Sequence, residues 1–226
     1  MTIIVKSAEP MTLVGAGSLT NLDVIQARNL APDVVAADGG AAHCLSFGLV
    51  PEAVIGDFDS LTEDVRAAFP AHKLHQITEQ ETTDFDKALR SVDAPLIVGI
   101  GFGGARVDHH LAAFNTLVRQ ANRRCLLLGG EDLVFAAPPD LTLKVAAGTR
   151  VSLFPMARVS GQSDGLMWPI DGLELAPDRR IGTSNTALGD VRLRMDAPGM
   201  LVILPRACLA EAVRALLAAD ATWPVL

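Results

Sequence analysis

The clearest structural signal in this sequence lies in residues 34–60, VVAADGGAAHCLSFGLVPEAVIGDFDS. Val34–Ala37 is a short apolar run that ends at an aspartate and two glycines, and Ala53–Ile55 is a second run that ends at Gly56 and Asp57. Short continuous apolar runs are typical of buried parallel strands, whose ligands gather beyond their carboxyl ends. The segment therefore predicts strand, acidic turn, short helix, strand and second acidic turn, with the carboxylates at one rim of a sheet.

A third acidic turn is predicted further along the chain. Thr83 is followed three residues later by Asp86, which approximates a capping box and predicts a helix that begins there. Asp84 would lie in the first turn of this helix, and Lys87 would share its face. An alternative interpretation is that Asp84 and Asp86 only favour the helix N-terminus electrostatically.

Two glycine-rich turns follow predicted strands. The first, Gly15-Ala16-Gly17, resembles the start of a dinucleotide-binding motif, but Thr20 stands where that motif needs its third glycine, so a tight strand-to-helix turn is the better interpretation. The second glycine-rich turn, GFGG at residues 101–104, precedes Arg106 and Asp108. Asp108 is a candidate N-cap of a helix that reaches about residue 122. Main-chain N–H groups there, with the arginine, can hold phosphate oxygens, or the aspartate only caps the helix.

The periodicity changes near residue 140, where apolar and polar residues begin to alternate with a period of two. We therefore expect an N-terminal Rossmann-like parallel-sheet α/β domain, residues 1–138, that binds nucleotide and metal. A C-terminal antiparallel β-sandwich domain, residues 139–226, should end in a helix over residues 210–219. Within it, Trp168 stands beside a proline, and residues 182–185, GTSN, read as a small polar turn.

Composition excludes several classes of protein. The chain has 226 residues, a net charge of −7 and no run of Lys or Arg, which disfavours a nucleic-acid partner. Its three cysteines are far apart, which fits neither a disulfide framework nor a zinc site. We find neither a signal-peptide pattern nor an apolar run of membrane-spanning length, and therefore expect a cytoplasmic protein without a membrane partner.

The acidic turns suggest a chemistry. Asp57 and Asp59 are two residues apart, and Asp38 and Asp84 should lie on neighbouring turns. Converging carboxylates repel one another and raise one another's pKa unless a cation is present, and Mg²⁺ prefers such oxygen ligands. This predicts metal-assisted transfer from a nucleotide, without the Walker A sequence of P-loop enzymes.

Taken together, the motifs resemble those of the thiamine pyrophosphokinase family. ADGGA, GDFDS, TTDFDKAL, GGARVDHH, GLMWP and GTSN occur in that family's order and span about residues 12–205. The resemblance implies transfer of the β,γ-diphosphoryl group of ATP to the hydroxyethyl oxygen of thiamine, giving thiamine diphosphate and AMP. It also implies Mg²⁺ and a homodimer with active sites at the subunit interface. The sequence departs from the family's pattern at Ala105, which separates the glycines from Arg106.

The same resemblance implies a role for each motif residue. The catalytic group would be Asp38, Asp57, Asp59 and Asp84, of which the last three hold the metal. The ATP-binding residues would be Gln80, Lys87, Arg106 and Asp108. Thiamine would be held by Trp168, Ser184 and Asn185 of the partner subunit. An aspartate of the catalytic group is expected to take the alcohol proton.

Two other functions remain open from the sequence. A haloacid-dehalogenase-like phosphatase would use Asp57 as a covalent nucleophile and Asp59 as its acid/base, and a phosphoenzyme would favour it. A non-catalytic module would bind nucleotide or cation without turnover, and ATP binding without AMP formation would point to it.

Overall fold

The computed structural model describes residues 2–104 and 106–225, so that Ala105 lies outside the described residues. The chain divides into two compact units, the first comprising Met1–Thr116 with Leu127–Gly129 and the second Leu117–Leu126 with Gly130–Leu226. Parallel pairing occurs in the first unit and antiparallel pairing in the second, which makes the fold a mixed α/β fold. The boundary expected between residues 138 and 139 stays a prediction.

The first unit is built on a parallel sheet with the strand order β7-β2-β3-β4-β5. The strands are β2 (Met11–Val14), β3 (Asp33–Ala37), β4 (Val54–Gly56), β5 (Leu74–Gln76) and β7 (Ile97–Ile100). A separate parallel pair joins β1 (Val5–Lys6) to β6 (Val92–Asp93), and the residues of β8 (Cys125–Gly129) are divided between the units. Val14, Ile55 and Ile100 are completely buried, as the continuous apolar runs predict.

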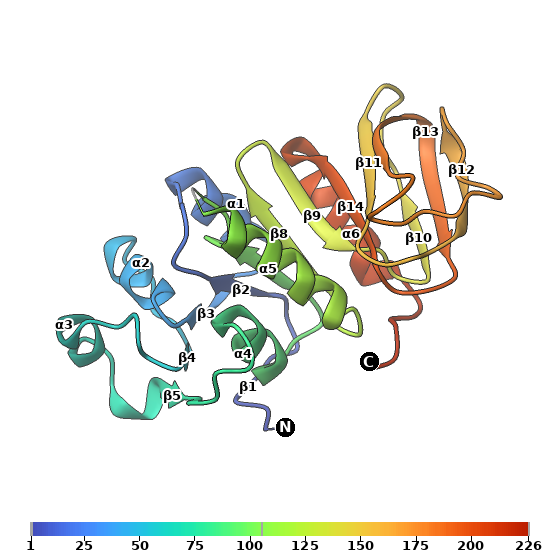
Figure 1. Ribbon diagram of the computed structural model, residues 1–226. Helices are drawn as coiled ribbons and strands as arrows, with labels where there is room; N and C mark the ends of the chain where they lie inside the picture. The colour runs from blue at the N-terminus through green and yellow to red at the C-terminus, as the bar shows by residue number, and fades with distance from the viewer. Residues whose placement is uncertain (1, 105, 226) are drawn as a thin grey trace. The chain divides into compact units, whose positions relative to one another are not determined.

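Three helices of the first unit begin after a threonine whose side chain caps them, at Thr20, Thr62 and Thr83. They are α1 (Asn21–Leu30), α2 (Gly40–Ser46), α3 (Glu63–Ala67), α4 (Asp84–Ser91), α5 (Val107–Arg119, which runs into the second unit) and a short 3₁₀ turn, Ala71–Lys73. Thr20 forms a full capping box with Asp23, and Thr83 accepts a hydrogen bond from the backbone N–H of Asp86. Figure 1 shows α4 beside β3 and β4, against which it packs.

One helix differs from its prediction. We expected Asp108 to cap a helix that reaches about residue 122, but α5 already begins at Val107 and ends at Arg119. Asp108 therefore lies inside the first turn, where a carboxylate still interacts favourably with the helix dipole.

The second unit is antiparallel, with the strand order β10-β13-β11-β14-β9 and with β12 also paired to β13 (Figure 1). Its elements are β9 (Asp132–Ala136), β10 (Asp140–Leu143), β11 (Arg150–Pro155), β12 (Gly161–Leu166), β13 (Gly182–Met195), β14 (Met200–Pro205), a 3₁₀ turn (Arg206–Cys208) and α6 (Leu209–Ala218). Alternate residues of β10, Leu141 and Leu143, are buried, as the period of two predicts.

The GTSN segment is not the turn that the sequence predicted. It forms the first part of β13 and pairs with β11 through Val151↔Asn185. Ser184 has a φ of 60°, in the left-handed region that favours glycine, and the register with β11 shifts beside it. Pairing with a distant strand has therefore overridden the local preference of small polar residues for turns.

Among the described residues, no helix combines the length and the apolar character needed to cross a membrane.

Candidate active site

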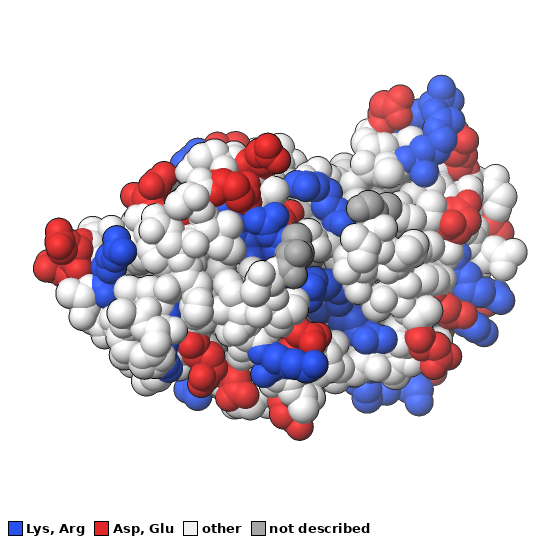
Figure 2. All heavy atoms as spheres, turned by 90° about the horizontal axis from the view of Figure 1, so that it is seen from below, with Lys and Arg blue, Asp and Glu red and all other residues white. Residues whose placement is uncertain are grey.

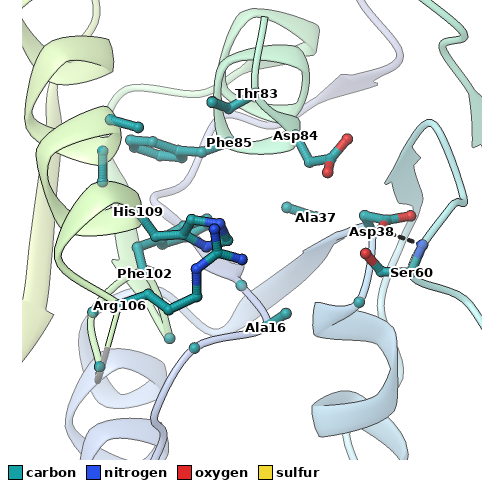
Figure 3. Close-up of a pocket in the computed structure, with 18 of the residues that line it drawn as sticks. Ala16, Ala37, Asp38, Ser60, Thr83, Asp84, Phe85, Phe102, Arg106 and His109 are labelled. Atoms are coloured by element: carbon teal, nitrogen blue, oxygen red, sulfur yellow. Dashed lines mark hydrogen bonds between the residues drawn. The ribbon is translucent and has the colours of Figure 1, made fainter. Parts of the chain in front are cut away.

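A pocket of about 760 Å³ lies in the first unit, at the carboxyl ends of the parallel strands (Figure 3). Its wall is formed by the turns after β2, β3 and β7 and by the start of α4. Ligands of open α/β sheets bind in this position because the loops of neighbouring strands converge there. The acidic turns that the sequence places at one rim of the sheet thus line a pocket.

The carboxylate of Asp38 stabilises the second acidic turn, residues 56–60, by hydrogen bonds to its backbone. Its side chain is 2% exposed, and its two carboxylate oxygens accept hydrogen bonds from the backbone N–H groups of Phe58 (2.9 Å) and Ser60 (3.2 Å). Figure 3 shows the second of these contacts. Gly56 packs so closely that an added Cβ would lie 2.6 Å from the Cβ of Asp38. The first acidic turn therefore determines the shape of the second.

The second turn has an unusual backbone that directs Asp57. Phe58 has a φ of 70°, in the left-handed region, and its side chain is buried. Asp57 donates its backbone N–H to Oδ1 of Asp84 (3.2 Å), and its own Oδ1 accepts from the N–H of Asp59 (3.1 Å). The two acidic turns and the start of α4 are consequently joined by hydrogen bonds to carboxylates, which are stronger than those between neutral groups.

Three of the four predicted carboxylates come together. One oxygen from each of Asp38, Asp57 and Asp84 lies within 4.8 Å of the others. The side chain of Asp59 is exposed and is outside this carboxylate trio, so its role stays a prediction. An all-oxygen donor set matches the ligands that Mg²⁺ prefers, and the trio therefore fits the implied metal.

Lys87 is buried beneath the trio. Its ammonium donates to Oδ2 of Asp57 (2.6 Å) and to Oδ1 of Asp84 (3.2 Å). Burial alone would lower the pKa of Lys87, but these two hydrogen bonds outweigh it and the pKa is raised. Burial also opposes ionisation of Asp57, yet the bond from Lys87 leads to a lowered pKa, whereas burial and the nearby Asp38 carboxylate raise the pKa of Asp84.

The other predicted nucleotide residues are placed differently. Gln80 and Arg106 line the pocket, whereas Asp108 does not and instead accepts from the Arg106 guanidinium at 2.6 and 3.2 Å. The loop that carries Gln80 is tied to α4, because Glu79 accepts a hydrogen bond from Arg90 (2.6 Å). Lys87 is not among the described residues that line the pocket.

Sequence reasoning did not single out His43, Phe102 or His109 as pocket residues. Figure 3 shows His109 with Arg106 on the side of the pocket opposite Asp38. His43 reaches the carbonyl oxygen of Gly17 (2.9 Å). His109 could have been found from its place in the GGARVDHH motif, which also contains Arg106. His43 and Phe102 could not, because an isolated imidazole or aromatic side chain has no periodic pattern in the sequence.

The two glycine-rich turns pack directly on each other. Gly17 donates its N–H to the carbonyl of Gly101 (2.6 Å), and Ser18 donates to that of Gly103 (2.8 Å). A Cβ added to Gly17 would lie 2.2 Å from the Gly103 oxygen, and Gly101 has a φ of 72°. The first glycine turn thus has a packing role, which accounts for its glycines without a dinucleotide-binding motif.

The predicted thiamine residues lie in the second unit, by a smaller hollow of about 300 Å³. Trp168 is 58% exposed and lines the hollow together with Asn185. The Asn185 amide donates to the Trp168 carbonyl (2.7 Å) and accepts from its N–H (3.2 Å), so it holds the backbone of that segment. Ser184 is not part of the lining; its N–H donates to the Ser152 hydroxyl (2.9 Å).

Charged side chains on the face shown in Figure 2 are interspersed by sign and separated by uncharged surface.

These features define a parallel α/β protein that presents a carboxylate trio and two glycine-rich turns to one pocket. Residues 26–127 match the family model of the thiamin pyrophosphokinase catalytic domain. A thiamine pyrophosphokinase of Bacillus subtilis (strain 168) is 31% identical over 131 residues, which are 50% of this chain and 61% of that relative. Over this part of its length, the chain is similar to thiamin pyrophosphokinases, and it spans about 61% of the length of this relative.

Solved structures agree on the fold. Thiamin pyrophosphokinase from Candida albicans has a TM-score of 0.73 at 16% identity, covering 89% of this chain and 92% of that one. Thiamin pyrophosphokinase from Geobacillus thermodenitrificans has a TM-score of 0.69 at 24% identity, covering 87% and 96%. These structures therefore share both units of the chain.

Proposed function

We propose that this chain is a thiamine diphosphokinase, which transfers the β,γ-diphosphoryl group of ATP to the hydroxyl of thiamine and releases thiamine diphosphate and AMP. The observation that carries the proposal is the carboxylate trio beside the pocket, all of it within the region that matches the family's catalytic domain. Diphosphoryl transfer needs groups that position phosphates and neutralise developing charge, and this pocket provides both kinds.

Asp57 and Asp84, with Asp59 as a further expected ligand, would hold Mg²⁺. When bound, this ion would neutralise charge on the phosphoryl oxygens. Arg106 and the backbone N–H groups of the glycine-rich turns would bind phosphate, while Gln80 and Asp108 would complete the nucleotide side. An aspartate of the catalytic group would accept the alcohol proton.

Thiamine would be bound by Trp168, Ser184 and Asn185 of the partner subunit in a homodimer. The exposed indole face suits a flat cationic ring, which it can attract by stacking and by cation–π interaction. We also propose that the first unit is a Rossmann-like domain, that the second is a β-sandwich, and that the protein acts in the cytoplasm.

The test is a product assay with ATP, Mg²⁺ and thiamine that separates AMP from ADP. Thiamine-dependent AMP in equal amount to thiamine diphosphate is the expected result. ADP as the product would contradict diphosphoryl transfer. A phosphoenzyme on Asp57 would favour the phosphatase, and ATP binding without any product would favour the non-catalytic module.

A further inference from the structure

The surroundings of Lys87 differ from the nucleotide-binding role that the family resemblance implies for it. A phosphate ligand needs access to the pocket, yet the side chain of Lys87 is only 1% exposed. It lies on the face of α4 that packs against β3 and β4, next to the completely buried Ala88 and Leu89. In this structure the ammonium of Lys87 is therefore withdrawn from the space of the pocket.

The contacts of its ammonium are both to carboxylates of the trio. The Asp57 oxygen lies at 2.6 Å and the Asp84 oxygen at 3.2 Å. Buried charges are stable only when they are paired, and two carboxylates this close together repel each other unless a cation lies between them. The ammonium therefore stabilises the arrangement of the trio in the protein without a metal.

We propose that Lys87 is a positioning residue, a resident counterion that holds Asp57 and Asp84 together and competes with a divalent cation for their oxygens. The inference rests on the proposed cation site. With all three carboxylates ionised, one ammonium leaves two negative charges uncompensated, which is the charge that one divalent cation neutralises. Lys87 thereby sets how strongly the empty site attracts a cation.

This role predicts the direction in which removal of the ammonium changes both the stability of the protein and its affinity for a cation. Without Lys87, the carboxylates repel one another, so the metal-free protein loses stability. The same repulsion makes the site more attractive to a cation, because a positive charge beside the ligands has been removed. Removing a lysine that does not contact the trio should change the affinity for a cation much less, because the interaction between two charges weakens with distance.

The experiment compares Lys87→Met with Lys73→Met, using Mn²⁺ without nucleotide as the probe. Lys73 is the matched control, because its ammonium in the same unit donates to the backbone carbonyl of Pro51 (2.7 Å). For Lys87→Met we expect Mn²⁺ to bind roughly three- to tenfold more tightly than to the wild type, measured by electron paramagnetic resonance. Its melting temperature should fall in EDTA and should rise with Mn²⁺ by more than that of the wild type. Lys73→Met should leave Mn²⁺ affinity unchanged.

A second variant keeps the test decisive if Lys87→Met does not fold. Lys87→Met combined with Asp84→Asn removes the ammonium and one carboxylate together, so it should be more stable in EDTA than Lys87→Met and should respond less to Mn²⁺. A double variant with no recovery of folding would overturn the inference.

Two further results separate the failure of this inference from that of the proposed function. If the wild type binds Mn²⁺ and Lys87→Met binds it equally or less tightly, Lys87 is not a competing counterion, although the cation site stands. If the wild type binds no Mn²⁺ and makes no AMP, the cation site and the proposed function fail, and this inference fails with them.

Discussion

The pocket of the first unit and the hollow beside Trp168 in the second differ in how their side chains are held. In the pocket, every member of the carboxylate trio takes part in a hydrogen bond with a backbone N–H group or with Lys87. In the hollow, Asn185 holds the backbone of the Trp168 segment, while the indole itself is 58% exposed. The carboxylates of the pocket are therefore held in place by hydrogen bonds, whereas the hollow presents an exposed aromatic side chain.

The strongest test of this difference is Asp57→Asn. We expect turnover to fall roughly a thousandfold, because the variant loses a cation ligand. It should also lose about 2 kcal/mol in the free energy of unfolding, because buried Lys87 loses its nearer partner. AMP release and urea unfolding measure the two effects. The control is Asp59→Asn, which should retain at least ten times the activity of Asp57→Asn, a difference of roughly 1.4 kcal/mol in the activation barrier. Equal losses of activity would show that the exposed carboxylate of Asp59 contributes as much to turnover as that of Asp57.

Asp38→Asn should have the next largest effect. An amide can accept one of the two backbone hydrogen bonds, but its NH₂ group would face the other N–H. We expect a loss of about 1–3 kcal/mol in the free energy of unfolding and weaker Mn²⁺ binding, as the turn that carries Asp57 loosens. A variant with unchanged stability in chemical denaturation would show that the turn holds its shape without this carboxylate.

A smaller, selective effect is expected in the second unit. Trp168→Ala should raise the KM for thiamine about tenfold, the loss of roughly 1.4 kcal/mol of stacking, and leave the KM for ATP within a factor of two. Stability should hardly change, because the side chain is largely exposed. The control is Trp223→Phe, which changes the chain's other tryptophan. A selective ATP defect would place Trp168 on the nucleotide side instead.

The smallest expected effect is a difference in the rate at which a reagent labels two cysteine thiols, one in each unit. Burial raises the pKa of Cys44 in the first unit to about 12, and it also raises that of the less buried Cys208 in the second. At pH 8 a thiol reagent should label Cys208 first and Cys44 only as the first unit opens. Because the folded state keeps the Cys44 proton, its contribution to stability is complete below its ordinary pKa of 9.0 and is lost as the pH rises toward 12. Equal labelling rates would show that burial does not protect Cys44 from the reagent.

Local sequence signals predicted much of the fold and part of the site. The strands and helix of residues 34–60 and the cap Thr83 depend on neighbouring residues, and the structure confirms them. The rim position of the acidic turns followed from the general behaviour of parallel strands. The burial of Lys87 could not be predicted, because it depends on which face of α4 meets the sheet. The strand at Asn185 was missed for the same reason, since it forms only by pairing with β11.

The close approach of Gly56 to Asp38 limits how this sequence can vary. Alanine at position 56 would bring its methyl carbon to 2.6 Å from the Asp38 Cβ. Every residue except glycine carries a Cβ, so only glycine at position 38 would remove this contact, and that change would take away the acceptor of the Phe58 and Ser60 N–H groups. In a randomised library, position 56 should therefore remain glycine in nearly all viable clones.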